Sequence, residues 1–414
     1  MVAAPIPDAP PVMMTPVVGL YEIELIRADY RCGATTSGAT KALTAGGTAW
    51  EDARMTSAAC PLDGIRVLDL TTFLSGPIAA MGLLQLGADV VKVEPPSGDV
   101  TRGGSTAPLS PFYWALHRGR RSIVLDLKNA EGREVLLELV READVLVENF
   151  RPGVMGRLGL DWPTLHAANP RLVVGSITGY GATGPMADAP AIDGVVQAFS
   201  GSFGLPQVYG QPAGPVPMTI ADLAAGAITA QGILASLFTR ERTGVGARIE
   251  VSLVDALLPW LCASDWVGSL KWPGTVVATG SDGLAFVVQT PSHFRARLSN
   301  LIGVEFAPTD EYGQAVRAAL GTRPRAEWLA VLAREGIPAA PVQTLEEALA
   351  HPSTATVDVE GRMLADSPFV IDGERRTLAA RPPTLGEHTD AVLRERLGYD
   401  DDMIRARRAA GAFG

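Results

Sequence analysis

A single carboxylate stands at the start of the longest apolar segment in the sequence. Asp222 lies within the run of small and apolar residues 217–226, whose composition predicts the beginning of a long helix. The free first-turn N–H groups and the positive dipole end of such a helix favour an ionised acid. Asp222 is therefore a candidate nucleophile. The alternative is an ordinary N-cap, in which the same carboxylate only satisfies first-turn N–H groups.

Cysteine and histidine form no pattern typical of a disulfide framework or a metal site. Cys32, Cys60 and Cys262 are an odd number, lie far apart and include no Cys-x-x-Cys pair. The 5 histidines show no spacing typical of metal ligands. We expect no bound metal, and a reducing cytoplasm as the compartment.

Composition indicates a large globular protein that handles small molecules. The chain has 414 residues, more than one core usually holds, and 47% of them are hydrophobic. Its net charge of −10 argues against a nucleic-acid binder, although a local basic pocket can still bind an anion. The longest apolar stretch, residues 223–238, is shorter than the ~20 residues that cross a bilayer, so we expect a buried helix and no membrane. The N-terminus has no basic residue before Arg27, unlike a secretory signal.

Alternating strands and helices begin at Pro61. The predicted strands cover residues 65–70, 89–94, 121–127, 144–148, 171–177 and 247–253. Pro77 is expected at the first position of a helix that Gly87 ends, and Asn129 is expected to cap the helix that follows the third strand. This alternation predicts a doubly wound, Rossmann-like and mostly parallel α/β sheet, which binds its ligands beyond the carboxyl ends of its strands.

Composition also divides the chain into parts. Residues 1–60 are expected to form a poorly ordered or peripheral extension. Residues 61–253, completed by 345–414, are expected to form the large domain. A linker helix over 254–267 and a smaller α+β domain over 268–344 complete the expected organisation.

Motifs in a fixed order give the chain a family resemblance over residues 61–260 and 325–412. They are Pro61-Leu62-Asp63-Gly64, Gly87-Ala88-Asp89-Val90-Val91-Lys92-Val93-Glu94-Pro95-Pro96, Gly98-Asp99, Thr101-Arg102, Asp126-Leu127-Lys128, Asp144-Val145-Leu146-Val147-Glu148-Asn149-Phe150-Arg151-Pro152-Gly153, Arg240-Glu241-Arg242-Thr243-Gly244, Gly336-Ile337-Pro338-Ala339 and Leu385-Gly386-Glu387-His388-Thr389. With Asp222 and the glycine loop at Gly179, they make the chain resemble the family III, or CaiB/BaiF-like, CoA-transferases.

The resemblance implies that Asp222 is the nucleophile of a CoA-transferase. Its carboxylate would attack an acyl-CoA thioester, form a mixed anhydride, and then carry CoA as an aspartyl thioester until an acceptor carboxylic acid reverses the steps. No cofactor is held permanently, since CoA and acyl-CoA are substrates. Members of the family also resemble one another in forming intertwined homodimers.

The resemblance further implies where CoA binds. The residues placed at the nucleotide are Phe73, Leu74, Ser75, Leu127, Lys128, Asn149 and Phe150, and the cations assigned to its phosphates are Arg102, Lys128, Arg151 and Arg157. These are ends of predicted parallel strands, where helix N-termini and backbone amides can meet phosphates.

Three features stay open between a functional and a structural interpretation. Asp193 sits where related transferases often carry an acid, and it either supports catalysis or caps a helix. The glycines of the loop, Gly179, Gly181 and Gly184, supply oxyanion donors or form an ordinary turn. The basic run of residues 118–121 binds phosphate or forms a solvated surface.

Two rival functions also stay open. In 2-methylacyl-CoA racemases of the same fold family, a histidine precedes the acid that matches Asp193, whereas this chain has Ile192, which cannot move a proton. A weakened acyl-CoA-binding homologue is the other rival. The chain is shorter than the family pattern over residues 266–283, where the family has a loop that covers the reacting aspartate.

Overall fold

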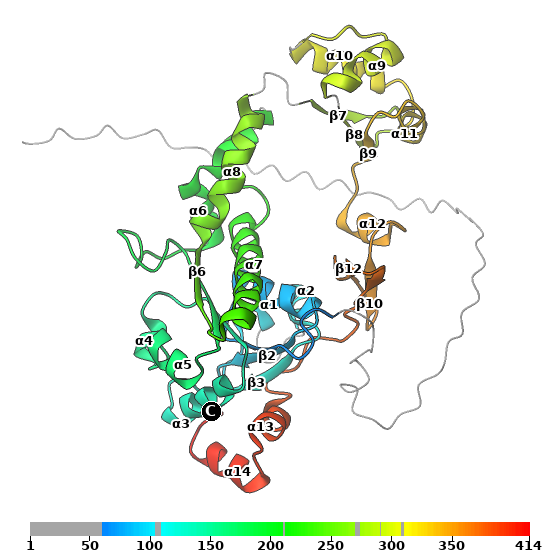
Figure 1. The fold of residues 1–414 in the computed structure, drawn as a ribbon. Coiled ribbons are helices and arrows are strands. Elements are labelled where there is room, and N and C mark those ends of the chain that lie inside the picture. Colours follow the sequence, from blue (N-terminus) through cyan, green and yellow to red (C-terminus); the bar gives the residue numbers. More distant parts are fainter. Residues whose placement is uncertain (1–59, 104–108, 210–211, 270–273, 290, 308–309) are drawn as a thin grey trace, which may run out of the picture. The chain divides into compact units, whose positions relative to one another are not determined.

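A parallel sheet of six strands forms the centre of the main part of the chain (Figure 1). The computed structural model describes residues 60–103, 109–209, 212–269, 274–289, 291–307 and 310–414. The strands are β1 (Arg66–Asp69), β2 (Asp89–Glu94), β3 (Arg121–Val124), β4 (Val145–Glu148), β5 (Val173–Thr178) and β6 (Arg248–Ser252). Their order is β3-β2-β1-β4-β5-β6 and every neighbouring pair is parallel, which confirms the predicted doubly wound fold.

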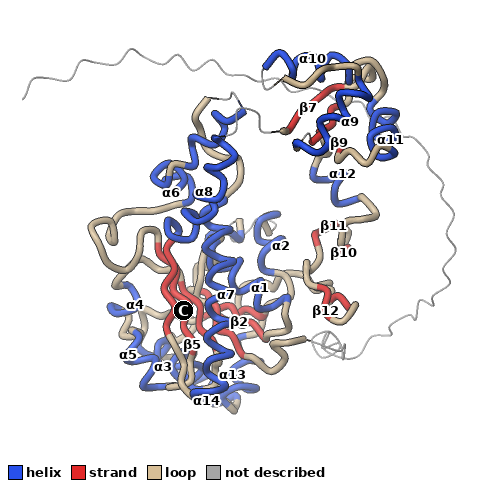
Figure 2. Tube along the Cα trace, turned by 45° about the horizontal axis from the view of Figure 1, so that its top comes forward, coloured by secondary structure: helices blue, strands red, loops and turns tan. Residues whose placement is uncertain are grey.

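Helices cover both faces of this sheet (Figure 2). They are α1 (Ser75–Gln85), α2 (Pro111–His117), α3 (Ala130–Arg141), α4 (Val154–Arg157), α5 (Trp162–Ala168), α6 (Asp193–Ser200), α7 (Ile220–Thr243), α8 (Leu253–Ser269), α13 (Thr389–Leu397) and α14 (Asp401–Ala409). One apolar core joins the sheet to α1, α7 and α8, and a second joins its other face to α3, α5, α13 and α14. The parallel strands are buried on both faces, which explains their nearly continuous apolar sequences.

Capping chemistry decides where several helices begin. The Asn129 side chain accepts a hydrogen bond from Glu131 N at 2.9 Å, which confirms it as the N-cap of α3. The prediction that Pro77 opens its helix was wrong by two positions, because α1 already begins at Ser75. Leu74, the N-cap residue of α1, makes no side-chain cap hydrogen bond.

By length and composition alone, α7 is sufficient to cross a membrane. It has 24 residues and contains an 18-residue window of mean hydropathy 1.5, of which 44% is buried in this fold. The apolar run read from the sequence ended at Phe238, whereas the helix continues to Thr243. Here α7 is a core helix: Ala224 and Ile233 are fully buried, and the helix packs against α1, α8 and β5.

A smaller antiparallel sheet has its own apolar core. Its strands are β7 (Thr275–Thr279), β8 (Ala285–Gln289) and β9 (Ala339–Pro341), and helices α9 (Ser292–Ile302), α10 (Asp310–Leu320) and α11 (Arg325–Arg334) belong to the same core. The remaining elements are the short helices η1 (Val100–Arg102) and η2 (Ser202–Tyr209), helix α12 (Leu345–Ala350), and strands β10 (Thr356–Val359), β11 (Arg362–Ala365), β12 (Val370–Ile371) and β13 (Glu374–Arg375). Apart from Cys60, the predicted extension over 1–60 lies outside the described residues.

Candidate active site

Asp222 lies where two helices begin side by side. It is the third residue of α7, only 5% of it is exposed, and the N-cap residue of α7 is Thr219. One turn later, a Cβ at Gly226 would lie 2.6 Å from the backbone oxygen of Ser75, the first residue of α1. The absence of a side chain at Gly226 therefore allows the first turn of α1 to approach the face of α7 that carries Asp222.

Asp193 supplies the cap of α7, although it belongs to another helix. It is the first residue of α6, and its Oδ1 accepts hydrogen bonds from the backbone N–H groups of Ala221 at 2.8 Å and Asp222 at 3.1 Å. Asp193 was predicted either to cap a helix or to support catalysis. It caps α7, and in doing so it also contacts the backbone of Asp222, so this geometry is compatible with both roles. For its own helix Asp193 is not the N-cap, since that position belongs to Ile192.

This arrangement reverses the expected electrostatics of Asp222. Burial, together with the negative charge of Asp193, raises the pKa of Asp222 to about 6, against the lowering effect of a hydrogen bond with the Ser75 side chain. The helix N-terminus was expected to favour the ionised form, whereas burial and the charge of Asp193 shift the pKa of Asp222 in the opposite direction, and Asp193 also accepts two of the first-turn N–H groups. A buried carboxylate whose pKa lies closer to neutral pH than usual is typical of a functional site.

We expect Gly226→Ala to reduce activity sharply. The new Cβ would lie 2.6 Å from Ser75 O and 2.7 Å from Ile78 Cβ, so α1 must shift away from Asp222. A displacement of about 1 Å at a reacting group can cost about a hundredfold in rate. Gly82→Ala is the matched control in the same α1/α7 contact, because its Cβ would meet only Ala230 Cβ at 3.6 Å. Turnover of the two variants, measured side by side, checks the prediction; equal turnover would contradict it.

The turn between β1 and α1 is held by side chains from other strands. Asn149, at the end of β4, accepts a hydrogen bond from Thr72 N at 2.9 Å and donates one to Thr72 O at 2.8 Å. Phe73 adopts φ +66°, in the left-handed region, and its exposed ring lies 5.9 Å from that of Phe112. Such a conformation is uncommon and costly for a non-glycine residue, and residues of this kind cluster at functional sites.

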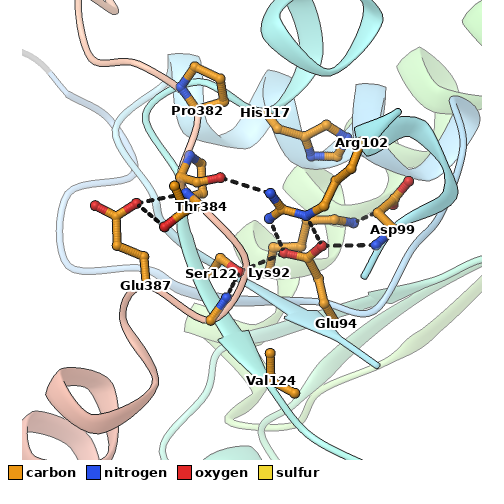
Figure 3. Close-up of polar contacts among 12 residues, drawn as sticks. Lys92, Glu94, Asp99, Arg102, His117, Ser122, Val124, Pro382, Thr384 and Glu387 are labelled. Atoms are coloured by element: carbon orange, nitrogen blue, oxygen red, sulfur yellow. Dashed lines mark hydrogen bonds and ion pairs between the residues drawn. The ribbon is translucent and has the colours of Figure 1, made fainter. Parts of the chain in front are cut away.

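A cluster of buried ion pairs, part of which Figure 3 shows, contacts this turn through Lys92. Lys92 Nζ lies 3.0 Å from Asp99 Oδ2 and donates a hydrogen bond to Thr71 O at 2.7 Å. On β1, Asp69 pairs with Arg120 at 2.5 Å, and both side chains are fully buried. No role was predicted for Lys92 or Asp69, although a charged residue inside an otherwise apolar strand was the available signal.

Arg102 belongs to the same buried cluster. Its guanidinium donates to both oxygens of Glu94, at 2.7 and 2.6 Å, and to Pro383 O at 3.0 Å (Figure 3). With its nitrogens occupied in this way, the geometry argues against the prediction that Arg102 binds a phosphate of CoA.

The basic run of residues 118–121 fits neither of its two predicted roles, phosphate binding or a solvated surface. Arg118 and Arg120 are buried, and Arg121 pairs with Asp89 at 2.5 Å and with Glu395 at 2.6 Å. The run is therefore neither a solvated surface nor a set of cations turned toward a ligand. It packs the segment between α2 and β3 into the sheet.

The remaining residues predicted for CoA lie in the segments that follow the ends of β1, β3 and β4. Lys128, Arg151 and Arg157 are exposed, the first after β3 and the others after β4. Phe150 is partly buried, and its N–H donates to Glu148 Oε2 at 2.8 Å. Leu127 is partly buried, whereas Leu74, the N-cap residue of α1, and Ser75, its first residue, are buried. Parallel order brings all these ends to one edge of the sheet.

The glycine loop after β5 has the geometry of a tight turn. Gly181 and Gly184 adopt φ +97° and +102°, and Gly181 N donates to Thr178 Oγ1 at 3.0 Å. At Gly179 a Cβ would lie 2.2 Å from Ala191 Cβ, so this position requires glycine for packing. Among the described residues, no group of three or more His, Cys, Asp or Glu side chains could hold a metal ion.

Comparison with known proteins shows the family of this chain. The sequence profile of CoA-transferase family III matches residues 62–287 and 272–389. The chain is 36% identical to an acetyl-CoA:oxalate CoA-transferase of Acetobacter aceti, over 76% of this chain and 90% of that protein. It is 33% identical to a succinate–glutarate CoA-transferase of Agrobacterium fabrum, over 81% of this chain and 95% of that protein.

The fold is shared with a solved structure as well. A CaiB/BaiF family protein from Brucella suis superposes with a TM-score of 0.72 at 30% identity, covering 82% of this chain and all of that one. The matched profile includes both helix starts that meet at Asp222. The chain therefore belongs to CoA-transferase family III and is a CoA-transferase.

Proposed function

We propose that Asp222 carries the CoA group covalently between an acyl-CoA donor and a carboxylic acid acceptor. One observation supports this most: a carboxylate that is 5% exposed lies beside the first turn of α1, with a raised pKa and another acid as its charged neighbour. A buried, incompletely neutralised acid is costly for stability, which favours a functional reason for keeping it.

The proposed reaction consists of four exchanges. An Asp222 oxygen attacks the donor thioester carbonyl, the C–S bond breaks, and CoA thiolate leaves an acyl-aspartyl anhydride. The thiolate attacks the aspartyl carbonyl, which releases the donor acid and leaves an aspartyl-CoA thioester. The acceptor carboxylate attacks this thioester and expels the thiolate, which then attacks the acceptor acyl carbon. New acyl-CoA and the free Asp222 carboxylate result, so the acyl energy is conserved throughout.

Helix α1 offers donors for the negative oxygens that form in these steps. Helix first-turn N–H groups have no partner within their own helix, and those of Ser75 and Gly76 lie at the end of α1 that approaches α7. Two such N–H groups and the dipole of α1 would stabilise an oxyanion on the aspartyl carbonyl. Burial of Asp222 would keep water from the anhydride.

We propose that CoA lies along the carboxyl edge of the sheet. The turn of Phe73 and Leu74, fixed by Asn149, would contact the nucleotide, with Lys128, Arg151 and Arg157 as the exposed cations for its phosphates. Arg102 is left out of this set because Glu94 already holds it. The acids named for the two transferases above differ, so we extend only their common class, a carboxylic acid, to this chain. The homodimer stays a prediction, which sedimentation of the full chain would test.

Trapping the covalent intermediate tests the proposal. The full chain is mixed with an acyl-CoA, and intact mass is followed with and without hydroxylamine. An adduct that hydroxylamine removes and that maps to Asp222 is the expected result. Acyl-CoA binding without any adduct would instead indicate a binding homologue. Exchange of the α-proton with deuterium in heavy water would indicate a racemase, whose second base Ile192 cannot supply.

The rate of adduct formation should have an acid limb near pH 6. Because the attacking group is the carboxylate, the rate should fall as pH drops through the pKa of Asp222, about 6. In Asp193→Asn the neighbouring negative charge is gone, so the pKa of Asp222 falls and the acid limb should move to lower pH. Asp161→Ala, which alters an exposed acid that caps α5, is the control and should leave the limb in place. A limb that moves to higher pH in Asp193→Asn would contradict the assignment.

A further inference from the structure

The side-chain amide of Gln197 hydrogen-bonds three groups near the start of α7. It lies one turn after Asp193 on α6 and is 2% exposed. Its Nε2 donates to Asp193 Oδ2 at 2.6 Å and to Met218 O at 2.8 Å, and its Oε1 accepts from Val216 N at 3.0 Å. The amide therefore binds both the acid that caps α7 and the segment that leads into α7.

These bonds continue to the backbone of the nucleophile. Gln197 Nε2 holds one oxygen of Asp193, and the other oxygen of Asp193 accepts the N–H groups of Ala221 and Asp222. We infer that Gln197 is a positioning residue: through Asp193 and the leading segment it fixes the first turn of α7, and thereby the direction of the Asp222 carboxylate. This inference rests on the proposed role of Asp222.

Only a side-chain amide of this length supplies the required set of bonds. Two donors face a carboxylate oxygen and a backbone oxygen, while one acceptor faces a backbone N–H, Val216 N. A carboxylate at this position would place a second negative charge against Asp193 and against Met218 O. An apolar side chain would remove the hydrogen-bond partner of the buried Asp193 Oδ2 and of Val216 N, which costs free energy at each, whereas Met218 O would keep its bond from Ile220 N.

The test compares Gln197→Glu with a matched exchange elsewhere. Asn169→Asp removes another side-chain amide that binds two backbone oxygens, those of Val140 at 2.9 Å and Ala143 at 2.8 Å. Each protein is mixed with acyl-CoA, and three quantities are measured: the single-turnover rate of the hydroxylamine-sensitive adduct, KM for acyl-CoA, and the thermal unfolding midpoint. Asn169 links the end of α5 to the end of α3 and does not contact the start of α7. The Asn169→Asp variant therefore measures the effect of losing a partly buried side-chain amide that is remote from Asp222.

We expect Gln197→Glu to slow adduct formation by about ten- to a hundredfold at unchanged KM, since misdirection of a reacting group affects the chemical step. Asn169→Asp should form the adduct at the wild-type rate, whatever it does to the unfolding midpoint. If Gln197→Glu is not soluble, Gln197→Met is compared with Asn169→Asp instead. Methionine has about the same length as glutamine and does not introduce the negative charge of glutamate.

The two proposals fail separately in this design. Equal adduct rates in the Gln197 and Asn169 variants, with a normal adduct in the wild type, would overturn the role of Gln197 and leave that of Asp222 intact. A loss expressed only in KM would also overturn it, because positioning of Asp222 does not act on acyl-CoA binding. No adduct at Asp222 in the wild type would overturn both.

Discussion

Asp222→Ala is expected to abolish CoA transfer, with a loss of at least about a thousandfold, because no other group can form the covalent intermediates. Affinity for CoA should stay close to that of the wild type, since the proposed nucleotide contacts come from the turn after β1 and the ends of β3 and β4. Steady-state transfer and equilibrium CoA binding, measured on the same preparations, check both parts.

Two controls separate loss of chemistry from loss of structure. Asp161→Ala changes an exposed helix-starting acid and should leave turnover unchanged. Thermal unfolding at about pH 7.5 should show Asp222→Ala to be at least as stable as the wild type. The reason is that burial raises the pKa of Asp222 to about 6, so its neutral form favours folding and its ionisation at higher pH opposes folding. Turnover retained in Asp222→Ala would exclude the assigned role.

Asp69→Leu is expected to lower the free energy of unfolding by about 3–5 kcal/mol, because it leaves the fully buried Arg120 without its ion partner. It also removes the acceptor of two hydrogen bonds from Thr71, at 2.9 Å from the backbone N and 2.5 Å from Oγ1, which hold the turn before α1. Urea unfolding of the variant and the wild type measures the difference.

A double variant distinguishes the two contributions. Adding Arg120→Met to Asp69→Leu removes the stranded charge, so most of the lost stability should return, although the Thr71 bonds do not. The exposed pair of Arg66 and Glu142, whose side chains are 45% and 53% exposed, provides the surface control. Arg66→Ala should cost less than about 1 kcal/mol. A similarly small cost for Asp69→Leu would show that the buried pair does not hold the turn.

The sequence predicted the sheet well because both faces of a parallel sheet are buried. Each strand therefore reads as an apolar run, and each helix between strands has a local start or stop signal, such as Asn129 before α3. Boundaries were less certain: β3 ends at Val124, three residues before the predicted end. Beyond Leu125 the chain no longer pairs with β2. The backbone N–H of Asp126 donates to the carbonyl oxygen of Ala412, which lies near the C-terminus.

Charged residues were interpreted least reliably, because their role depends on which charge lies opposite. Arg102 and Arg120 were read as candidate phosphate ligands, whereas the fold pairs them with Glu94 and Asp69. No sequence pattern pointed to Gln197. Its partners Val216 and Met218 lie in a separate segment of the chain, and only the tertiary structure brings that segment next to α6.

By itself, the sequence determined the fold class and the family, and it singled out Asp222 as the candidate nucleophile. Residue order and local composition carry those facts, because apolar periodicity and turn chemistry act over short distances along the chain. Only the tertiary structure decided the electrostatic state of Asp222. Its neighbours are Asp193, 29 positions away, and Ser75, from the opposite end of the large sheet's sequence. A pKa depends on distance and burial in space, and neither can be read from positions in a sequence.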